Sequence, residues 1–228
     1  WIALAALAGW AAPAGAQTSL VRGDIALTGY NSTGTDEIAF VLLRDAEAGT
    51  AISFTERGWF AAGGFRSGEA TFTVVTARAY PCGTEFRAVM SPLAVFDSSG
   101  ASAGALSGGG LALSTAGDQV FVYQGPEPTA ADESGLLTAL QMNGPWDADA
   151  TSANTSARPS SMTDGVDALF IAPEVDNARY DCSVVSGTRD VLAAAAHDAA
   201  RWTRDDANPF DLTVGCSFSC SVPPTPAP

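Results

Sequence analysis

Short segments with a strand-like pattern of apolar and polar residues dominate the chain from Gly23 onward. Apolar residues in these segments either alternate with polar residues or form a continuous run, and turns rich in Gly, Asn, Asp and Ser separate them, which is typical of β-strands. The pattern predicts strands at residues 24–30, 37–43, 51–55, 69–75, 85–90, 119–123, 168–171 and 208–214. Residues 111–114 also alternate, and the Gly-containing turn 115–118 predicts a hairpin between them and residues 119–123.

One segment has the pattern of a helix. Thr188 is a suitable N-cap, Asp190 lies in the first turn, and residues 191–200 are rich in Ala. The apolar residues of this segment form one stripe, which we expect to pack on an edge or an open end of the sheets. His197 lies off the stripe and is expected at the surface. Two polar stretches, residues 97–110 and 147–163, are predicted to be surface connections.

The two ends of the chain have the composition of processing and linker segments. Residues 1–16 are almost wholly apolar and end in Ala-Gly-Ala, which is typical of the apolar part of a secretory signal peptide cleaved between Ala16 and Gln17. No Met or basic residue precedes this stretch, so we expect the chain to begin inside the signal; the alternative is a buried N-terminal helix. Residues 222–228 are Pro-rich and predict a linker to a further domain or tail. The predicted β-sandwich domain is 17–221.

The charge balance restricts the classes of partner. The chain has 25 Asp and Glu residues and 11 basic residues, all of them Arg, for a net charge of −14. Such a surface repels phosphate backbones and anionic lipid, so neither nucleic acid nor a membrane is expected as a partner. The acidic surface has three interpretations: solubility of a secreted protein, adaptation to a salty habitat, or calcium binding.

Four cysteines, Cys82, Cys182, Cys216 and Cys220, lie in the predicted domain. In an exported chain an even number indicates disulfides, whereas zinc would need further ligands and the chain has a single His and no CxxC pair. Three pairings are possible. Cys216 and Cys220 lie too far apart to bridge directly if CSFSC is extended, which leaves two of the three pairings. Of these two we expect Cys182 with Cys216 and Cys82 with Cys220.

Several strand segments share features with a known fold family. GDIALTGYNSTGTDEIAFVLL places an acidic dipeptide before an apolar strand, and LALSTAGDQVFVYQG places Ser-x-x-Gly-Asp between two strands. These segments resemble the lamin-tail type of immunoglobulin-like β-sandwich, and AGTAISFTERGWF with FRSGEATFTV resembles an N-terminal module of secreted bacterial proteins. The resemblance covers residues 23–125, and more weakly the region to NPFDL. It implies an all-β sandwich with one short helix and a supporting or binding role, and it carries no catalytic residues.

No catalytic motif is visible in the sequence. A Ser-His-Asp arrangement would depend on His197, no G-x-S-x-G or phosphate-binding motif occurs, and nothing singles out a pair of carboxylates for glycoside hydrolysis. We therefore expect a protein that is not an enzyme.

Two groups of residues are candidates for binding. Calcium prefers oxygen ligands on bent loops. The densest groups of acidic residues are Asp36 with Glu37, Asp147 with Asp149, and Asp205 with Asp206. The alternative for each group is that its carboxylates are solvated side chains of a loop or turn. The Gly-rich turn RGWFAAGGF carries Trp59, Phe60 and Phe65. These rings are candidates for stacking on sugar rings or for seating a partner. The alternative is that they pack onto the end of the sandwich, which is the interpretation we favour for Trp59.

The sequence thus favours a secreted, extracellular, monomeric module. Its expected role is non-catalytic attachment to a surface, a glycan or a neighbouring domain, with calcium as the candidate structural ion. The alternative is an accessory N-terminal domain of an extracellular hydrolase, of the nuclease or esterase type, whose catalytic domain would follow Pro228.

Overall fold

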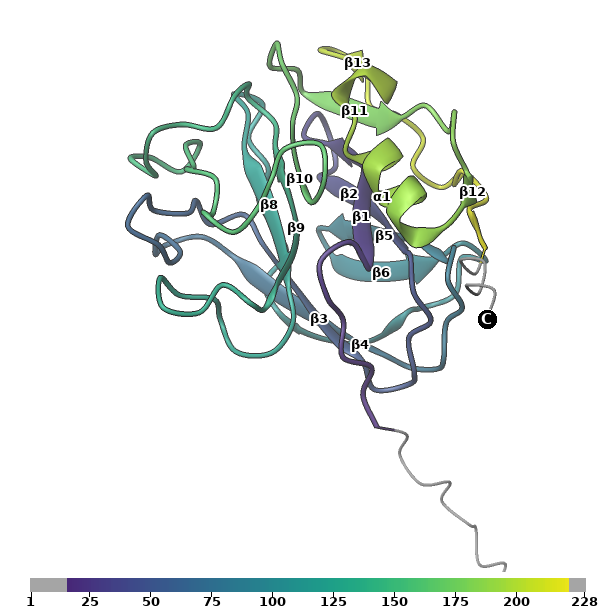
Figure 1. The fold of residues 1–228 in the computed structure, drawn as a ribbon. Helices are drawn as coiled ribbons and strands as arrows, with labels where there is room; N and C mark the ends of the chain where they lie inside the picture. Colours follow the sequence, from purple (N-terminus) through teal and green to yellow (C-terminus); the bar gives the residue numbers. More distant parts are fainter. Residues whose placement is uncertain (1–15, 222–228) are drawn as a thin grey trace, which may run out of the picture.

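Residues 16–221, which the computed structural model describes, fold as a two-sheet β-sandwich (Figure 1). The first sheet contains β1 (Ile25–Asn31), β2 (Glu37–Leu42), β5 (Glu85–Met90), β6 (Leu93–Asp97), β11 (Asn177–Tyr180) and β13 (Trp202–Asp205), in the order β13-β11-β1-β2-β5-β6. The second contains β3 (Ala51–Thr55), β4 (Thr71–Thr76), β7 (Gly104–Gly108), β8 (Gln119–Tyr123), β9 (Leu136–Gln141) and β10 (Ala168–Phe170), in the order β10-β9-β8-β3-β4-β7. All pairings within these two sheets are antiparallel except that of β9 with β10. The predicted all-β sandwich is confirmed. The predicted linker and all of the predicted signal peptide except Ala16 lie outside the described residues.

A ladder of phenylalanines joins the two sheets. Phe40 and Phe86 are register partners in the first sheet and stack with ring centroids 5.0 Å apart. Phe54 and Phe72 are register partners in the second sheet and stack at 4.9 Å. Phe40 also contacts Phe54 at 4.7 Å, so the ladder crosses the interface. Each ring is buried, and full burial of such a side chain contributes about 1.5–3 kcal/mol. The apolar positions that predicted strands therefore also form the core.

The predicted helix is α1 (Arg189–Ala196), followed by the short helix η1 (Ala199–Arg201). The Thr188 side chain accepts a hydrogen bond from the Val191 amide, as expected of an N-cap. Buried positions of α1 pack against β1, and the helix covers one side of the sandwich (Figure 1). No helix among residues 16–221 is long and apolar enough to cross a membrane.

The predicted surface position of His197 is wrong. Its side chain is 3% exposed, with Nε2 2.8 Å from Thr138 Oγ1 on β9 and Nδ1 2.7 Å from the Ala193 carbonyl. His197 is the C-cap residue, where the backbone departs from helical geometry, so helical periodicity no longer predicts where its side chain lies. Burial lowers the pKa of this imidazole.

Three local predictions also fail. Residues 104–108, predicted as part of a flexible connection, form β7 and pair with the edge of β4. Residues 111–114 are not a strand, and β8 pairs with β3 and β9 instead of forming the predicted hairpin. Residues 208–214, predicted as a final strand, are irregular. Backbone pairing across the sheets decides the first two cases, and the local side-chain pattern does not report it.

Residues 208–218, which we call the C-terminal strap, cross the outer face of the first sheet. The Asn31 side chain holds one end, accepting from the Phe210 amide at 2.9 Å and donating to the Phe210 carbonyl at 2.9 Å. At the other end Glu85 accepts from the Ser217 amide.

Two disulfides fasten the chain around the strap, Cys182–Cys216 and Cys82–Cys220, with Cα atoms 5.2 and 5.9 Å apart. These are the pairings that the sequence favoured. Beyond the strap, β12 (Ser186–Gly187) and β14 (Ser219–Cys220) form a small parallel sheet. The last described residues are therefore anchored by both covalent bonds and backbone pairing.

Candidate functional site

Most of the acidic residues predicted to bind calcium are engaged in local hydrogen bonds. Asp36 accepts from the Leu113 amide, and the adjacent Glu37 pairs with Arg87 and accepts from Asn31 Nδ2. The structure does not bring these carboxylates together with the other predicted pairs in any metal-like group among residues 16–221. The other candidates make turn or loop contacts: Asp147 with Ser156 and Gln141, Asp149 with Ala61 and Ala150, and Asp205 with Ala207 and Asn208.

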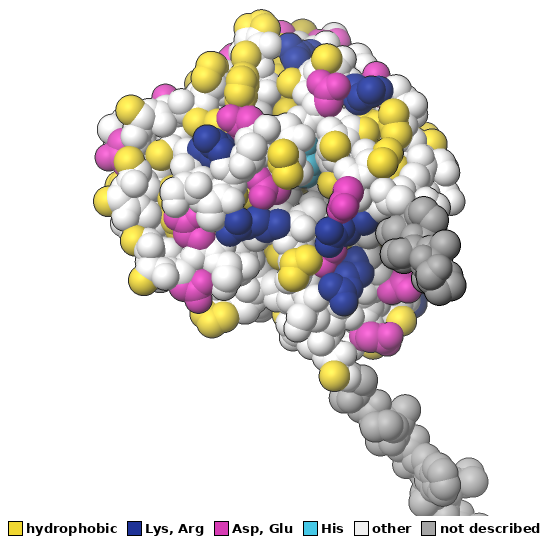
Figure 2. Space-filling view, in the orientation of Figure 1, with side chains coloured by type: hydrophobic (Ala, Val, Ile, Leu, Met, Phe, Trp, Pro, Cys, Tyr) yellow, Lys and Arg dark blue, Asp and Glu magenta, His cyan; other side chains and the backbone are white. Residues whose placement is uncertain are grey.

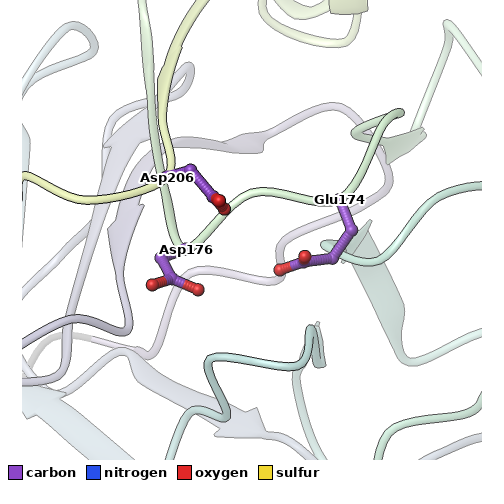
Figure 3. Close-up of side chains that lie close together, drawn as sticks. All are labelled: Glu174, Asp176 and Asp206. Carbon is purple, nitrogen blue, oxygen red and sulfur yellow. The ribbon is translucent and has the colours of Figure 1, made fainter.

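Asp206 is the exception, because it joins Glu174 and Asp176 in a group that we call the acidic cluster (Figure 3). One carboxylate oxygen from each residue lies within 4.8 Å of those of the other two. Asp176 precedes β11 and Asp206 follows β13, and the register pair Asn177–Asp205 of these antiparallel strands places them at the same end of the sheet. Glu174 and Asp176 were not among the residues predicted from the sequence, since their proximity to Asp206 depends on this pairing.

Tyr30 of β1 and Thr33 in the turn after β1 hold the segment that carries Glu174 and Asp176. Tyr30 Oη donates to the Val175 carbonyl at 3.0 Å, and Thr33 Oγ1 donates to Asp176 Oδ2 at 2.8 Å. Glu174 Oε1 is buried and has no hydrogen-bond partner among the described residues, and its carboxylate faces Asp176 (Figure 3). Burial, together with the charges of Asp176 and Asp206, raises the pKa of Glu174. The arrangement therefore concentrates negative charge around an unsatisfied oxygen.

Of the three aromatic residues predicted to form a binding face, only Phe60 is accessible. Trp59 is 1% exposed and Phe65 is 8% exposed, whereas Phe60 is 36% exposed. Trp59 and Phe65 meet edge to face at 5.0 Å, and Phe65 contacts Phe121 of β8 at 5.3 Å. They form a second, smaller core at one end of the sandwich. The packing interpretation of Trp59 is thus confirmed, and a direct contact of buried Trp59 or Phe65 with a ligand is excluded in this conformation.

Trp146 lies at the outer edge of this second core. Its ring packs against Phe121 at 5.8 Å, and its Nε1 donates to Asp164 Oδ1 at 2.7 Å. The half-buried ring lines an open groove of about 450 Å³, here called the Trp146 groove, together with Phe170, Asp147, Asp164 and Arg158. Trp146 is not among the aromatic residues that the sequence predicted to form a binding face. Its position in GPWDAD, within a polar loop, was the available signal of exposure.

Two buried carboxylates, Glu56 and Asp118, and the half-buried Asp36 hold the loop before β8. The amides of Ala112, Leu113 and Ser114 donate in turn to Glu56, Asp36 and Asp118. Asp118 also accepts from the Gln119 amide and thus stabilises the turn in which it lies. Burial raises the pKa of all three carboxyl groups, that of Asp118 to about 8. These groups satisfy backbone donors that no strand partner reaches, so their role is structural.

The single histidine is not available as a general base in this conformation. Its two ring nitrogens contact Thr138 and the Ala193 carbonyl inside the fold, whereas a triad histidine must reach a nucleophile and a substrate.

Acidic and basic side chains are interspersed on the face that carries α1 (Figure 2). Comparison of the chain with protein-family models, curated protein sequences and solved structures gave no match in any of the three.

Proposed function

We propose that this chain is a secreted, non-catalytic module that attaches to carbohydrate through the Trp146 groove. The observation that carries the proposal is the position of the Trp146 ring, which packs on Phe121 within the fold and also lines an open groove. An aromatic ring with one side supported and the other accessible suits stacking against the apolar face of a sugar.

The polar residues around the ring support the same ligand class. Asp147, Asp164 and Arg158 line the groove and offer carboxylate acceptors and guanidinium donors, which match the hydroxyl groups of a sugar. The Trp146–Asp164 hydrogen bond fixes the ring, and the second core beneath it, with Trp59 and Phe65, limits its movement. A site that is ordered before binding loses less conformational entropy on association.

The two disulfides support the secreted part of the proposal, because disulfides persist in oxidising compartments such as the periplasm and the extracellular space. The signal-like residues 1–16 point to the same route of export. The lamin-tail resemblance remains a prediction about the type of sandwich.

The proposal is tested by measuring retention of the protein on immobilised glucans, xylan, mannan, chitin and peptidoglycan. We expect one of them to bind, and Trp146→Ala to weaken that binding about tenfold, which corresponds to about 1.4 kcal/mol. Phe60→Ala is the matched control, because Phe60 is an exposed aromatic residue on the neighbouring loop but does not line the groove. Equal retention of the wild-type protein and the Trp146 variant would contradict the proposal, as would the failure of every polysaccharide to bind.

We also propose that calcium binds at the acidic cluster and stabilises the module. The specific observation is Glu174 Oε1, a buried oxygen without a hydrogen-bond partner that a cation would satisfy. Calcium takes six to eight oxygen ligands, so backbone carbonyls or water would complete the shell around the three carboxylates.

Thermal unfolding with and without calcium tests this second proposal. Calcium is expected to raise the melting temperature of the wild-type protein, since a ligand of the folded state stabilises it by mass action, and Asp176→Asn is expected to remove the shift. Asp205→Asn is the control, because Asp205 is adjacent to the cluster but accepts turn amides instead. An equal shift in the Asp176 variant would show that calcium acts elsewhere.

A further inference from the structure

A separate pocket lies between the outer face of the first sheet and the C-terminal strap. Thr28, Ala39, Arg87, Phe96 and Arg179 contribute to it from the sheet, and residues 212–216 contribute from the strap. Its volume is about 130 Å³. An engineered cavity of about 150 Å³ binds benzene, so this space suits a molecule of about that size. We call it the strap pocket.

Strand register explains the shape of the strap pocket. The pairs Arg179–Gly29, Gly29–Ala39, Ala39–Arg87 and Arg87–Phe96 form one continuous row across five strands. Directly paired residues project from the same face of a sheet. The row therefore has two small residues in its centre and an arginine on each side.

Gly29 lies directly beneath the roof of the pocket. A Cβ atom at this position would lie 2.8 Å from Leu212 Cδ2, so Leu212 of the strap sits directly over the glycine. The small residues Gly29 and Ala39 at the centre of the row thus leave room for the strap and for the pocket beneath it.

The strap that roofs the pocket is held on both sides. Asn31 clamps the backbone of Phe210, while the Cys182–Cys216 disulfide and the Glu85–Ser217 contact secure the other side. A roof held at both ends gives a preformed site, which lowers the entropic cost of ligand binding.

Arg179 differs from the other ten arginines in its available hydrogen-bond donors. Within residues 16–221, eight arginines form ion pairs: Arg44, Arg57, Arg66, Arg78, Arg87, Arg158, Arg189 and Arg201. Arg22 and Arg204 each donate to two backbone carbonyls. Arg179 donates one bond of 3.3 Å to the Asp211 carbonyl and has no carboxylate within ion-pair distance among the described residues. A guanidinium carries five N–H donors in a fork that matches a carboxylate.

The acidic residues that line the strap pocket already have partners. Asp97 pairs with Arg78 and accepts from the Ser99 and Ala101 amides. Glu85 accepts from the Ser217 amide, and burial raises its pKa, which favours its neutral form. Neither carboxylate is therefore positioned to attract a cation, and Arg179 is the arginine beside the pocket that has no carboxylate partner among the described residues.

We propose that the strap pocket binds a small organic carboxylate, with its charged group on Arg179 and its apolar part between Phe96, Ala39 and Leu212. Arg87 supplies a second positive charge on the other side of Gly29 and Ala39, where it pairs with Glu37 and lies over the Phe96 ring at 5.4 Å. Since Arg87 already has a carboxylate partner, its contribution to affinity is smaller than that of Arg179. This site is independent of the Trp146 groove.

Titration of the full chain with benzoate, benzamide and benzylamine, followed by NMR, tests the charge preference with three molecules of nearly the same shape. We expect benzoate to bind at least tenfold more tightly than benzamide, and benzylamine to bind more weakly still. The affinity for benzoate is expected to fall at least tenfold in Arg179→Gln and about threefold in Arg87→Gln. Arg201→Gln is the control, since Arg201 pairs with Asp198 and does not line the pocket.

A second variant tests the location without removing any charge. Ala39→Leu fills the floor of the pocket and is expected to abolish benzoate binding while both arginines remain. Equal binding of benzoate and benzamide would refute the preference for a carboxylate. Sulfate binding as tightly as benzoate would refute the role of the apolar walls. Absence of binding by any probe, or undiminished binding in Arg179→Gln or Ala39→Leu, would refute the site itself.

Discussion

Removal of the Cys182–Cys216 disulfide is expected to lower the free energy of unfolding by about 4 kcal/mol. The bond joins residues separated by 34 positions in the sequence. A cross-link restricts the unfolded chain, and the loss of loop-closure entropy for a loop of that length corresponds to about 4 kcal/mol at 25 °C. Domains of this kind are stable by about 5–15 kcal/mol, so the double variant Cys182→Ala/Cys216→Ala is expected to remain folded but to unfold at much lower denaturant.

The second disulfide provides an internal comparison. Cys82–Cys220 closes a loop of 138 positions, for which the same relation gives about 5 kcal/mol. If restriction of the unfolded chain is the main effect, Cys82→Ala/Cys220→Ala must destabilise the protein at least as much as the first pair. If local contacts of the strap alone mattered, loss of Cys182–Cys216 would be the more destabilising change, because Cys216 lies within the strap and Cys220 lies beyond it.

Urea unfolding of the oxidised wild-type protein and both double variants, followed by near-ultraviolet circular dichroism, measures the two differences. The pairing is checked first by mass spectrometry of the intact disulfides. Losses below about 1 kcal/mol in both variants would refute the entropic reasoning. A loss confined to the Cys182–Cys216 variant would instead show that docking of the strap dominates.

Three further predictions concern buried side chains. Burial lowers the pKa of His197, so the folded protein with neutral His197 has its full stability above the unfolded pKa of about 6.5. The free energy of unfolding is expected to decline as the pH falls below that value, by at most about 1.4 kcal/mol per pH unit. Urea unfolding of His197→Gln at several pH values should lack this decline. Burial raises the pKa of Asp118 from 3.8 to about 8, so stability is expected to decline as the pH rises through that interval, and Asp118→Asn should flatten this decline in the same assay. Trp59→Ala is expected to lower the free energy of unfolding by about 3–5 kcal/mol. It should also weaken any polysaccharide retention that depends on Trp146, because Trp146 packs against the second core that contains Trp59. A folded variant that is retained as well as the wild-type protein would contradict this coupling.

The candidate sites were predictable only where neighbours in sequence are also neighbours in space. Asp118 lies in the turn that it stabilises, so its role follows from the local sequence. Asp206 was a calcium candidate because of its neighbour Asp205, yet the structure separates their roles and places Asp206 with Glu174 and Asp176. Trp146 and Phe170 are the aromatic residues that line the groove, whereas Trp59 is buried in the second core against which Trp146 packs.

Sequence alone determined the elements that depend on local pattern. Alternating apolar residues specified β1 to β5 to within two residues at either end, since they reflect a strand with a buried face, and Thr188 specified the start of α1 through its own side chain. Tertiary structure decided the rest. β7 forms because the edge of β4 offers unpaired backbone groups, which leave no signature in the side chains of residues 104–108. The row that joins Arg179 to Arg87 likewise depends on the register of strands that are distant in sequence, and only packing of the whole sandwich sets that register.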